Sequence, residues 1–298
     1  MRPADIRITR VGTTKDRLGE GPIWDAETAC LFWIDSLAGV IHRLDPVSGA
    51  RQDYTVPAPI GSMSLCRSGG AILALQDGFH RHDFETGRTT PFASLGLNHP
   101  NVRLNDGKTD RQGRFLAGTM HLHRGEEEPV VGGLFRLNPE GTVTPLVHDI
   151  ATANGPCFSP DGRTFYFADS SRQTIWAFDY DTTSGTPHNK RLFADLRPLG
   201  TAPDGATVDA DGHVWSALVR TGTIARFDPA GRIVFQLEFP VRYPTSLAFG
   251  GPALDVLYVT SISKSVRFED VHEDAGGLFA VEHLGVRGLA EPRCTLSG

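Results

Sequence analysis

Short runs of apolar, β-branched and aromatic residues alternate with polar turns along the whole chain. The alternation has a repeating unit in two parts. The first part is a polar turn followed by an apolar run, and it occurs at 25–35, 67–75, 110–119, 159–169, 209–218 and 250–260. The second part is an apolar run that ends in an acidic or amide residue and a glycine turn, and it occurs at 40–49, 78–87, 134–141, 175–185, 224–231 and 278–285. Because the two parts alternate strictly, the pattern indicates one structural unit written six times.

Each repeat predicts a small antiparallel sheet. Its runs are short, rich in Val, Ile, Leu, Phe, Tyr and Trp, and bounded by Gly, Asp and Pro turns, which is typical of strands. Two hairpins per unit make a four-stranded sheet, and copies of such a sheet bury both faces when they stack around an axis. The sequence therefore predicts an all-β fold, a six-bladed β-propeller with four-stranded antiparallel blades around a central channel.

The N-terminal run DIRITRVG (5–12) looks like a strand without a repeat of its own. We expect it to be the outer strand of the last blade, where it would close the ring. No linker or shift in composition divides the chain, so we expect residues 1–298 to form a single domain.

Aligning the six repeats on the first turn reveals a shared polar position. The residues five places before each turn all carry a side-chain oxygen: Glu20, Ser62, Asn105, Asn154, Asp204 and Thr245. The first strand of each propeller blade lines the channel, so equivalent positions form a ring around the axis. Glu20, Asn154 and Asp204, with Asn105 nearby, would therefore point oxygens at one spot.

This ring position suits a divalent cation. Two carboxylates and two amides, without Cys or His, favour a hard ion such as Ca²⁺, Mg²⁺ or Mn²⁺, and Zn²⁺ and Fe²⁺ remain open. The alternative is a set of ordinary turn residues, because Asn, Asp and Gly favour turns. Four of them in register across six repeats weigh against that alternative.

Other polar residues are expected around the ring. Arg103 lies two residues before Asn105, so the two share one face of a strand. Asp106 should point the other way and brace the turn. The charged segment 119–133 is a candidate lid over the channel mouth; its His121 and His123 are either ligands or, more commonly for such loops, surface histidines. We expect the acidic run 126–128 to be a solvated tip.

Composition narrows the function classes. The formal net charge is −6 without a basic run, which argues against a nucleic-acid partner. No apolar segment has the length of a membrane span, and the charged N-terminus is unlike a signal peptide, so we expect no membrane association and a cytoplasmic location. The four cysteines have no CxxC spacing and are expected to be buried free thiols. No GxSxG, Walker or GxGxxG motif occurs in a suitable setting.

Four segments carry a resemblance to a known family: LGEGPIWD (18–25), RLNDGKTDRQGRFLAGTM (103–120), NGPCFSPDGRTFYFADS (154–170) and PDGATVDADGHVWSAL (203–218). In order and spacing they resemble the gluconolactonase/regucalcin (senescence marker protein) family. The resemblance implies a six-bladed propeller that holds one divalent cation and hydrolyses sugar lactones. It implies that Glu20, Asn154 and Asp204 are the metal ligands.

The same resemblance implies that Arg103 and Asn105 hold the substrate and take part in catalysis, and that Asp204 is also the general base. His123 is expected to contact the substrate from the lid. This chain departs from animal members, which carry an acidic residue shortly after the GTM, by having His121, Leu122 and His123 there.

The sequence thus predicts a metal-dependent lactonase of the hydrolase class that acts in carbohydrate metabolism. Its partner would be a small-molecule sugar lactone, a neutral aldonolactone before an aldarolactone, and its cofactor one divalent cation: Ca²⁺, Zn²⁺, Mn²⁺, Mg²⁺ or Fe²⁺. We expect a monomer or weak homodimer. Two alternatives stay open: a non-catalytic calcium-binding or divalent-metal-binding regulatory protein of regucalcin type, and a scaffold that binds peptides on its top face.

Overall fold

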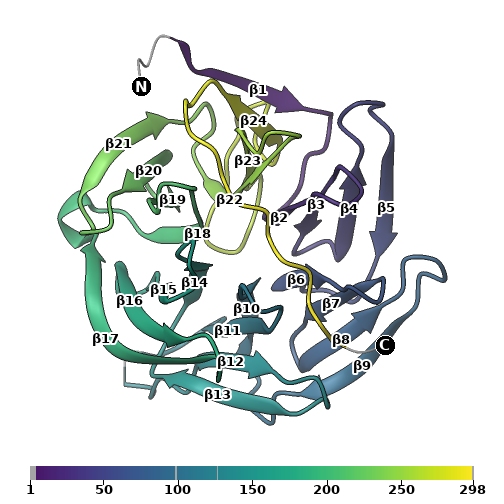
Figure 1. Ribbon diagram of the computed structural model, residues 1–298, viewed down its shortest axis with the longest axis vertical. Helices are drawn as coiled ribbons and strands as arrows, with labels where there is room; N and C mark the ends of the chain where they lie inside the picture. The colour runs from purple at the N-terminus through teal and green to yellow at the C-terminus, as the bar shows by residue number, and fades with distance from the viewer. Residues whose placement is uncertain (1–4, 98, 126, 297–298) are drawn as a thin grey trace.

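Six four-stranded antiparallel sheets surround a central channel in the computed structural model of the chain (Figure 1). The structure describes residues 5–97, 99–125 and 127–296. Within five of the sheets the strands follow one another in chain order from the channel outward. The six-bladed β-propeller predicted from the repeat is therefore confirmed.

The first five blades are built from consecutive strands. Blade 1 contains β2 (Gly19–Asp25), β3 (Cys30–Asp35), β4 (Val40–Leu44) and β5 (Arg51–Thr55). Blade 2 contains β6 (Ser62–Leu65), β7 (Ala71–Ala74), β8 (Gly78–His82) and β9 (Thr89–Ser94). Blade 3 contains β10 (Val102–Thr109), β11 (Phe115–His121), β12 (Gly133–Leu137) and β13 (Val143–His148). Blade 4 contains β14 (Ala153–Phe158), β15 (Thr164–Asp169), β16 (Thr174–Asp181) and β17 (Thr186–Asp195). Blade 5 contains β18 (Pro203–Val208), β19 (Val214–Leu218), β20 (Thr223–Phe227) and β21 (Ile233–Glu238).

Blade 6 joins the two ends of the chain. It contains β22 (Pro244–Gly250), β23 (Val256–Ser261) and β24 (Leu278–Glu282), and its outer strand is β1 (Arg7–Val11). β1 runs antiparallel to β24, with Arg7 opposite Glu282 and Val11 opposite Leu278. The predicted closure of the ring by the N-terminal strand is confirmed. A short 3-10 helix, η2 (Arg197–Leu199), follows β17, and no helix in the described residues is long and apolar enough to cross a membrane.

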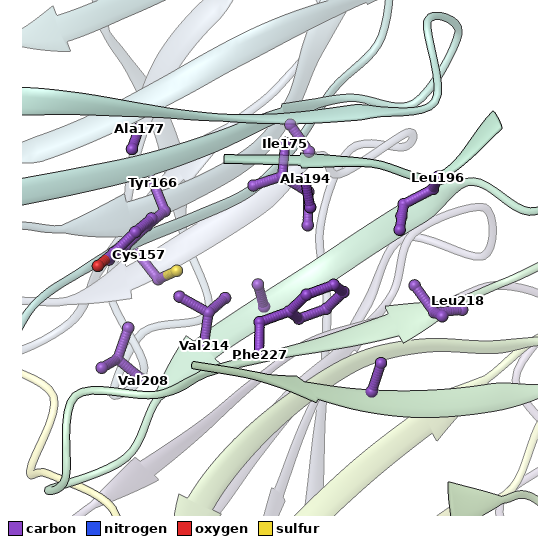
Figure 2. Packing of buried hydrophobic residues seen from close by; sticks show 13 residues of the cluster. Cys157, Tyr166, Ile175, Ala177, Ala194, Leu196, Val208, Val214, Leu218 and Phe227 are labelled. Carbon is purple, nitrogen blue, oxygen red and sulfur yellow. The ribbon is translucent and has the colours of Figure 1, made fainter. Parts of the chain in front are cut away.

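The hydrophobic core lies between neighbouring blades. Figure 2 shows the layer between blades 4 and 5, where Tyr166 and Ile175 face Val214 and Phe227. These side chains alternate along their strands with residues on the opposite face, so each sheet is buried on both sides by its neighbours. This packing is the physical reason for the repeat. The four cysteines are buried and free, as expected.

The innermost strands are irregular at the ring position. In blades 1, 3, 4, 5 and 6 the pairing between the first and second strands shifts register at or beside that position. Such a β-bulge bends the strand and re-aims a side chain. Gly155, directly after Asn154, has φ +54° and would place a Cβ 2.7 Å from the backbone oxygen of Asp204, so only glycine fits there.

The C-terminal segment closes one end of the channel, which we call the closed end. It crosses the centre of the ring in Figure 1. Glu291 lies 3.5 Å from Lys108 and 3.7 Å from Arg111, and Arg293 pairs with Asp25 at 2.7 Å. Those partners lie near the ends of the innermost strands, so a ligand has to enter from the other end, the open end.

Candidate metal and substrate site

A cavity of about 330 Å³ occupies the open end of the channel. The predicted residues Glu20, Arg103, Asn105, Asn154 and Asp204 all line it. The glycines after Glu20 and Asp106, together with Asp106 itself, line a smaller space toward the closed end. The ring therefore forms the floor of the larger cavity. The fold brings these residues together although they lie far apart in the sequence, as the alignment of the repeats predicted.

Hydrogen bonds between blades fix the ring. Both hydrogens of the Asn105 amide are used, because Nδ2 donates to the backbone oxygen of Ala153 at 2.8 Å and to Asn154 Oδ1 at 3.0 Å. Asn154 Nδ2 donates to Ser170 Oγ at 2.8 Å. These bonds fix the orientation of both amide groups, with Asn154 Oδ1 as an acceptor inside the network.

The remaining two ring positions have a different role. Ser62 Oγ donates to the backbone oxygen of Asn105 at 2.8 Å, and Thr245 Oγ1 donates to the backbone oxygen of Gly19. Both residues are buried and neither lines the cavity. Ser62 and Thr245 therefore hold neighbouring blades together on the sides of the channel without carboxylates or amides.

Two carboxylates line the same cavity: Glu20, which is partly buried, and Asp204, which is buried. Burial, then the charges of Asp204 and Asp106, raise the pKa of Glu20 well above its usual value. Burial, then the charge of Asp106, raise the pKa of Asp204 in the same way. Each carboxylate accepts a hydrogen bond from the backbone of the glycine that follows it, Gly21 or Gly205, which offsets only part of the repulsion.

Asp106 is the third carboxylate of this region. It accepts the backbone N–H of Gly107 and that of Gly155, both at 2.8 Å. Gly107 lies in β10 and Gly155 in β14, so Asp106 joins the register shifts of two neighbouring innermost strands and does not brace a turn as expected. Its negative charge also raises the pKa values of Glu20 and Asp204. An extended strand would direct Asp106 away from these carboxylates, but the register shift at this position brings it near them.

Arg103 is a buried cation beside these carboxylates. Only 4% of its surface is exposed. Its Nη1 donates to the backbone oxygen of Leu104 at 2.7 Å, whereas its Nε is buried without a partner in the described residues. Burial lowers the pKa of Arg103 to about 10, with Glu20 acting against the shift and Arg267 acting with it. Arg103 therefore stays charged at neutral pH and has a free donor.

The donor set fits a divalent cation. A bound cation would relieve the repulsion that raises the carboxylate pKa values, and carboxylate and amide oxygens are ligands for hard ions. Within the described ranges, no group of three or more His, Cys, Asp and Glu side chains is arranged to hold a metal. The set Glu20, Asn154 and Asp204 has two such side chains and one amide, so an oxygen-binding ion matches it better than a thiolate- or imidazole-binding one.

The segment 119–133 differs in part from its prediction as a loop. Residues 119–121 belong to β11, and Gly133 begins β12. His121 is only 3% exposed, does not line the cavity, and packs edge-on against His99, so its interpretation as a surface-loop histidine or ligand was wrong. His123 is exposed and does line the cavity.

The acidic run in this segment is only partly described, because Glu126 lies outside the described residues. Glu128 is half-buried and pairs with His99 at 3.2 Å. Its side chain also accepts the backbone N–H of Gly125 at 3.0 Å. Glu128 therefore fastens the loop instead of forming a solvated tip.

A second long loop covers the cavity and was not anticipated. It joins β23 to β24 in blade 6, and residues 265–268 line the cavity. Arg267 Nη2 donates to the backbone oxygen of His121 at 3.2 Å, which joins blade 6 to blade 3 on the opposite side of the ring. The signal in the sequence was the gap between the two parts of the sixth repeat, which is longer than in any other repeat.

Comparisons with known proteins match the whole propeller. The family model described as "SMP-30/Gluconolactonase/LRE-like region" matches residues 18–263. The chain is 34% identical to regucalcin of Xenopus laevis, covering 96% of this chain and 98% of that protein. It is also 34% identical to 6-deoxy-6-sulfogluconolactonase of Pseudomonas putida, covering 92% and 94%. A solved structure of regucalcin from Agrobacterium tumefaciens, described as a calcium-binding protein, is 30% identical, covers 97% of each chain and superposes with a TM-score of 0.87.

Proposed function

The chain belongs to the SMP-30/gluconolactonase/LRE-like family, and from that premise we propose that it is a divalent-metal-dependent sugar lactonase. The observation that carries the proposal is the pair of carboxylates, the partly buried Glu20 and the buried Asp204, at the floor of a cavity that Arg103 also lines. A relative named as a lactonase matches over nearly its full length. The family and this relative support lactone hydrolysis; the metal and the residue roles are our inference.

Glu20, Asn154 and Asp204 would hold the cation. When bound, such an ion polarises a carbonyl group and lowers the pKa of water. Asp204 has two carboxylate oxygens, so it can serve as a ligand and still accept the proton of the attacking water.

The hydrolysis then follows from the remaining side chains. The water oxygen bonds to the lactone carbonyl carbon, the ring C–O bond breaks, and the ring oxygen takes up a proton as the hydroxy acid forms. Arg103 lines the cavity, so its guanidinium would offset the negative charge that develops on oxygen. Both amide hydrogens of Asn105 already have acceptors, so its Oδ1 would accept a hydroxyl of the substrate.

A panel of aldonolactones assayed with a pH indicator tests the proposal. The chelator-treated protein should be inactive, and one or more of Ca²⁺, Mg²⁺, Mn²⁺, Zn²⁺ and Fe²⁺ should restore acid release. Equal activity with and without chelator would contradict metal dependence.

The second candidate function is non-catalytic metal binding, which is favoured by the solved relative described as a calcium-binding protein. The same ring would hold the ion, but no turnover would follow. Saturable ion binding without hydrolysis of any lactone in the panel would favour this second function.

A further inference from the structure

The cavity at the open end is rich in arginine. Arg103, Arg220 and Arg267 line it, against the two carboxylates of Glu20 and Asp204. The three arginines come from blades 3, 5 and 6, so separate elements converge on one space. The protein as a whole has a formal net charge of −6. The cavity differs from it in sign, because three arginines face two carboxylates there.

None of these arginines forms an ion pair with another described residue. Arg103 Nε is buried and unpartnered in the described residues. Arg267 has one hydrogen bond, to the backbone oxygen of His121, and its charge lowers the pKa of Arg103. Arg220 is exposed, and in the described part of the chain no carboxylate lies within ion-pair distance of it. Like charges placed together repel, so this arrangement lowers stability unless a negative ligand offsets it.

Several arginines outside the cavity have an acidic partner. Arg114 pairs with Asp110, Arg172 with Asp149 and Arg226 with Asp209. Exposed arginines such as Arg163 also have no acidic partner in the described residues, so the cavity is distinguished by three unmatched arginines that line one space. Unmatched arginines that face a cavity are suited to recognise a planar or tetrahedral anion through several N–H donors.

We infer that the substrate is an anionic lactone, with a carboxylate, sulfonate or phosphate group at the end remote from the reacting carbonyl. The inference rests on the proposed lactonase function and adds the substrate class. The carbonyl end would lie against the ring floor, where Glu20, Asn154 and Asp204 would hold the cation. The anionic end would lie at the rim, where Arg220 and Arg267 are available.

A matched pair of substrates tests the inference. D-Glucaro-1,4-lactone and D-glucono-1,4-lactone differ only in a carboxylate or a CH₂OH group at C6. D-Glucono-1,5-lactone and its 6-phosphate provide a second pair, which separates carboxylate from phosphate recognition. The metal-loaded full-length protein should prefer an anionic member through a lower KM, and high salt should weaken that preference.

Three variants locate the effect. Arg220→Gln and Arg267→Gln should each raise KM for the preferred anionic lactone about tenfold, the order expected for a hydrogen bond to a charged group. They should leave KM for its neutral partner within about twofold. Arg163→Gln is the control, because Arg163 is exposed on the turn between β14 and β15, at the far end of its blade, and should change neither.

The possible failures are distinguishable. If neutral and anionic partners are hydrolysed equally well, or if both Gln variants raise the two KM values alike, the anionic substrate class is wrong and the lactonase stands. If no lactone is hydrolysed, calorimetric titration with the same pairs decides: tighter binding of the anionic member, lost in Arg267→Gln, would retain the anion site and reject the lactonase. Equal or absent binding would reject the inference as well.

Discussion

The two ends of the channel use charged side chains in opposite ways. At the closed end, Glu291 and Arg293 of the C-terminal segment are matched with Lys108, Arg111 and Asp25. At the open end, three arginines and two carboxylates share one cavity without a single ion pair among them. Paired charges hold a structure together, whereas unpaired buried charges are retained at the expense of stability. The difference indicates that the closed end is structural and that the open end binds a ligand.

The largest effect is expected from the ring carboxylates. Asp204→Ala or Glu20→Ala should reduce lactone hydrolysis by about 10³-fold or more and abolish metal binding, since each removes both a ligand and a negative charge. The fold should persist, because the core is divided among six interfaces between blades. Turnover, bound metal and circular dichroism check this.

Ser62→Ala is the matched control for the ring, because Ser62 occupies the same position in blade 2 without facing the cavity. Its activity should stay within a few-fold of the wild type. If Asp204→Ala keeps full activity, or if Ser62→Ala loses as much activity as Asp204→Ala, ring residues that line the cavity would not differ in function from those that only hold blades together.

A smaller effect is expected at Arg103. Arg103→Met keeps the length of the side chain but removes the donors, and it should lower kcat by about 10²-fold, as loss of one oxyanion donor does. Metal binding should be retained, since no ligand changes. A variant that loses metal but keeps kcat when metal is added in excess would show that Arg103 acts on the ion site and not on the substrate.

The closed end should show the reverse behaviour. Arg293→Gln leaves the buried carboxylate of Asp25 without its bidentate partner and should lower the free energy of unfolding by about 1–3 kcal/mol. kcat/KM should remain within about twofold. Thermal or urea denaturation measures the effect on stability, and lactone turnover of the same sample measures the effect on activity. A loss of activity without a loss of stability would contradict a structural role for Arg293.

The smallest effect concerns pH in the chelated protein. Folded-state pKa values raised above the unfolded values mean that Glu20 and Asp204 bind more protons when folded, so stability is highest in acid and falls as pH rises from about 4 through the raised values. Added Ca²⁺ should remove much of this fall. The expected change in Tm is a few degrees, at about 2–4 °C per kcal/mol; a melting temperature that rises with pH in chelator would contradict it.

The fold and the ring followed from the sequence because both depend on repetition. Six copies of one pattern predict six blades, and a shared position in the innermost strands has to face the axis. The position of Asp106 did not follow, because a register shift between Leu104 and Gly107 changes where it points. The cover of the cavity was also missed in part, since Arg220 and Arg267 lie in loops without periodicity and their convergence depends on how the blades close into a ring.

The account depends most directly on whether catalysis follows metal occupancy. The decisive measurement is lactone hydrolysis during titration of the chelator-treated protein with a divalent cation, with bound metal determined at each step. We predict that activity rises in proportion to bound metal and saturates at one ion per chain, and that Asp204→Ala shows neither binding nor turnover. Activity that is independent of bound metal, or saturable metal binding without hydrolysis of any lactone, would contradict the account.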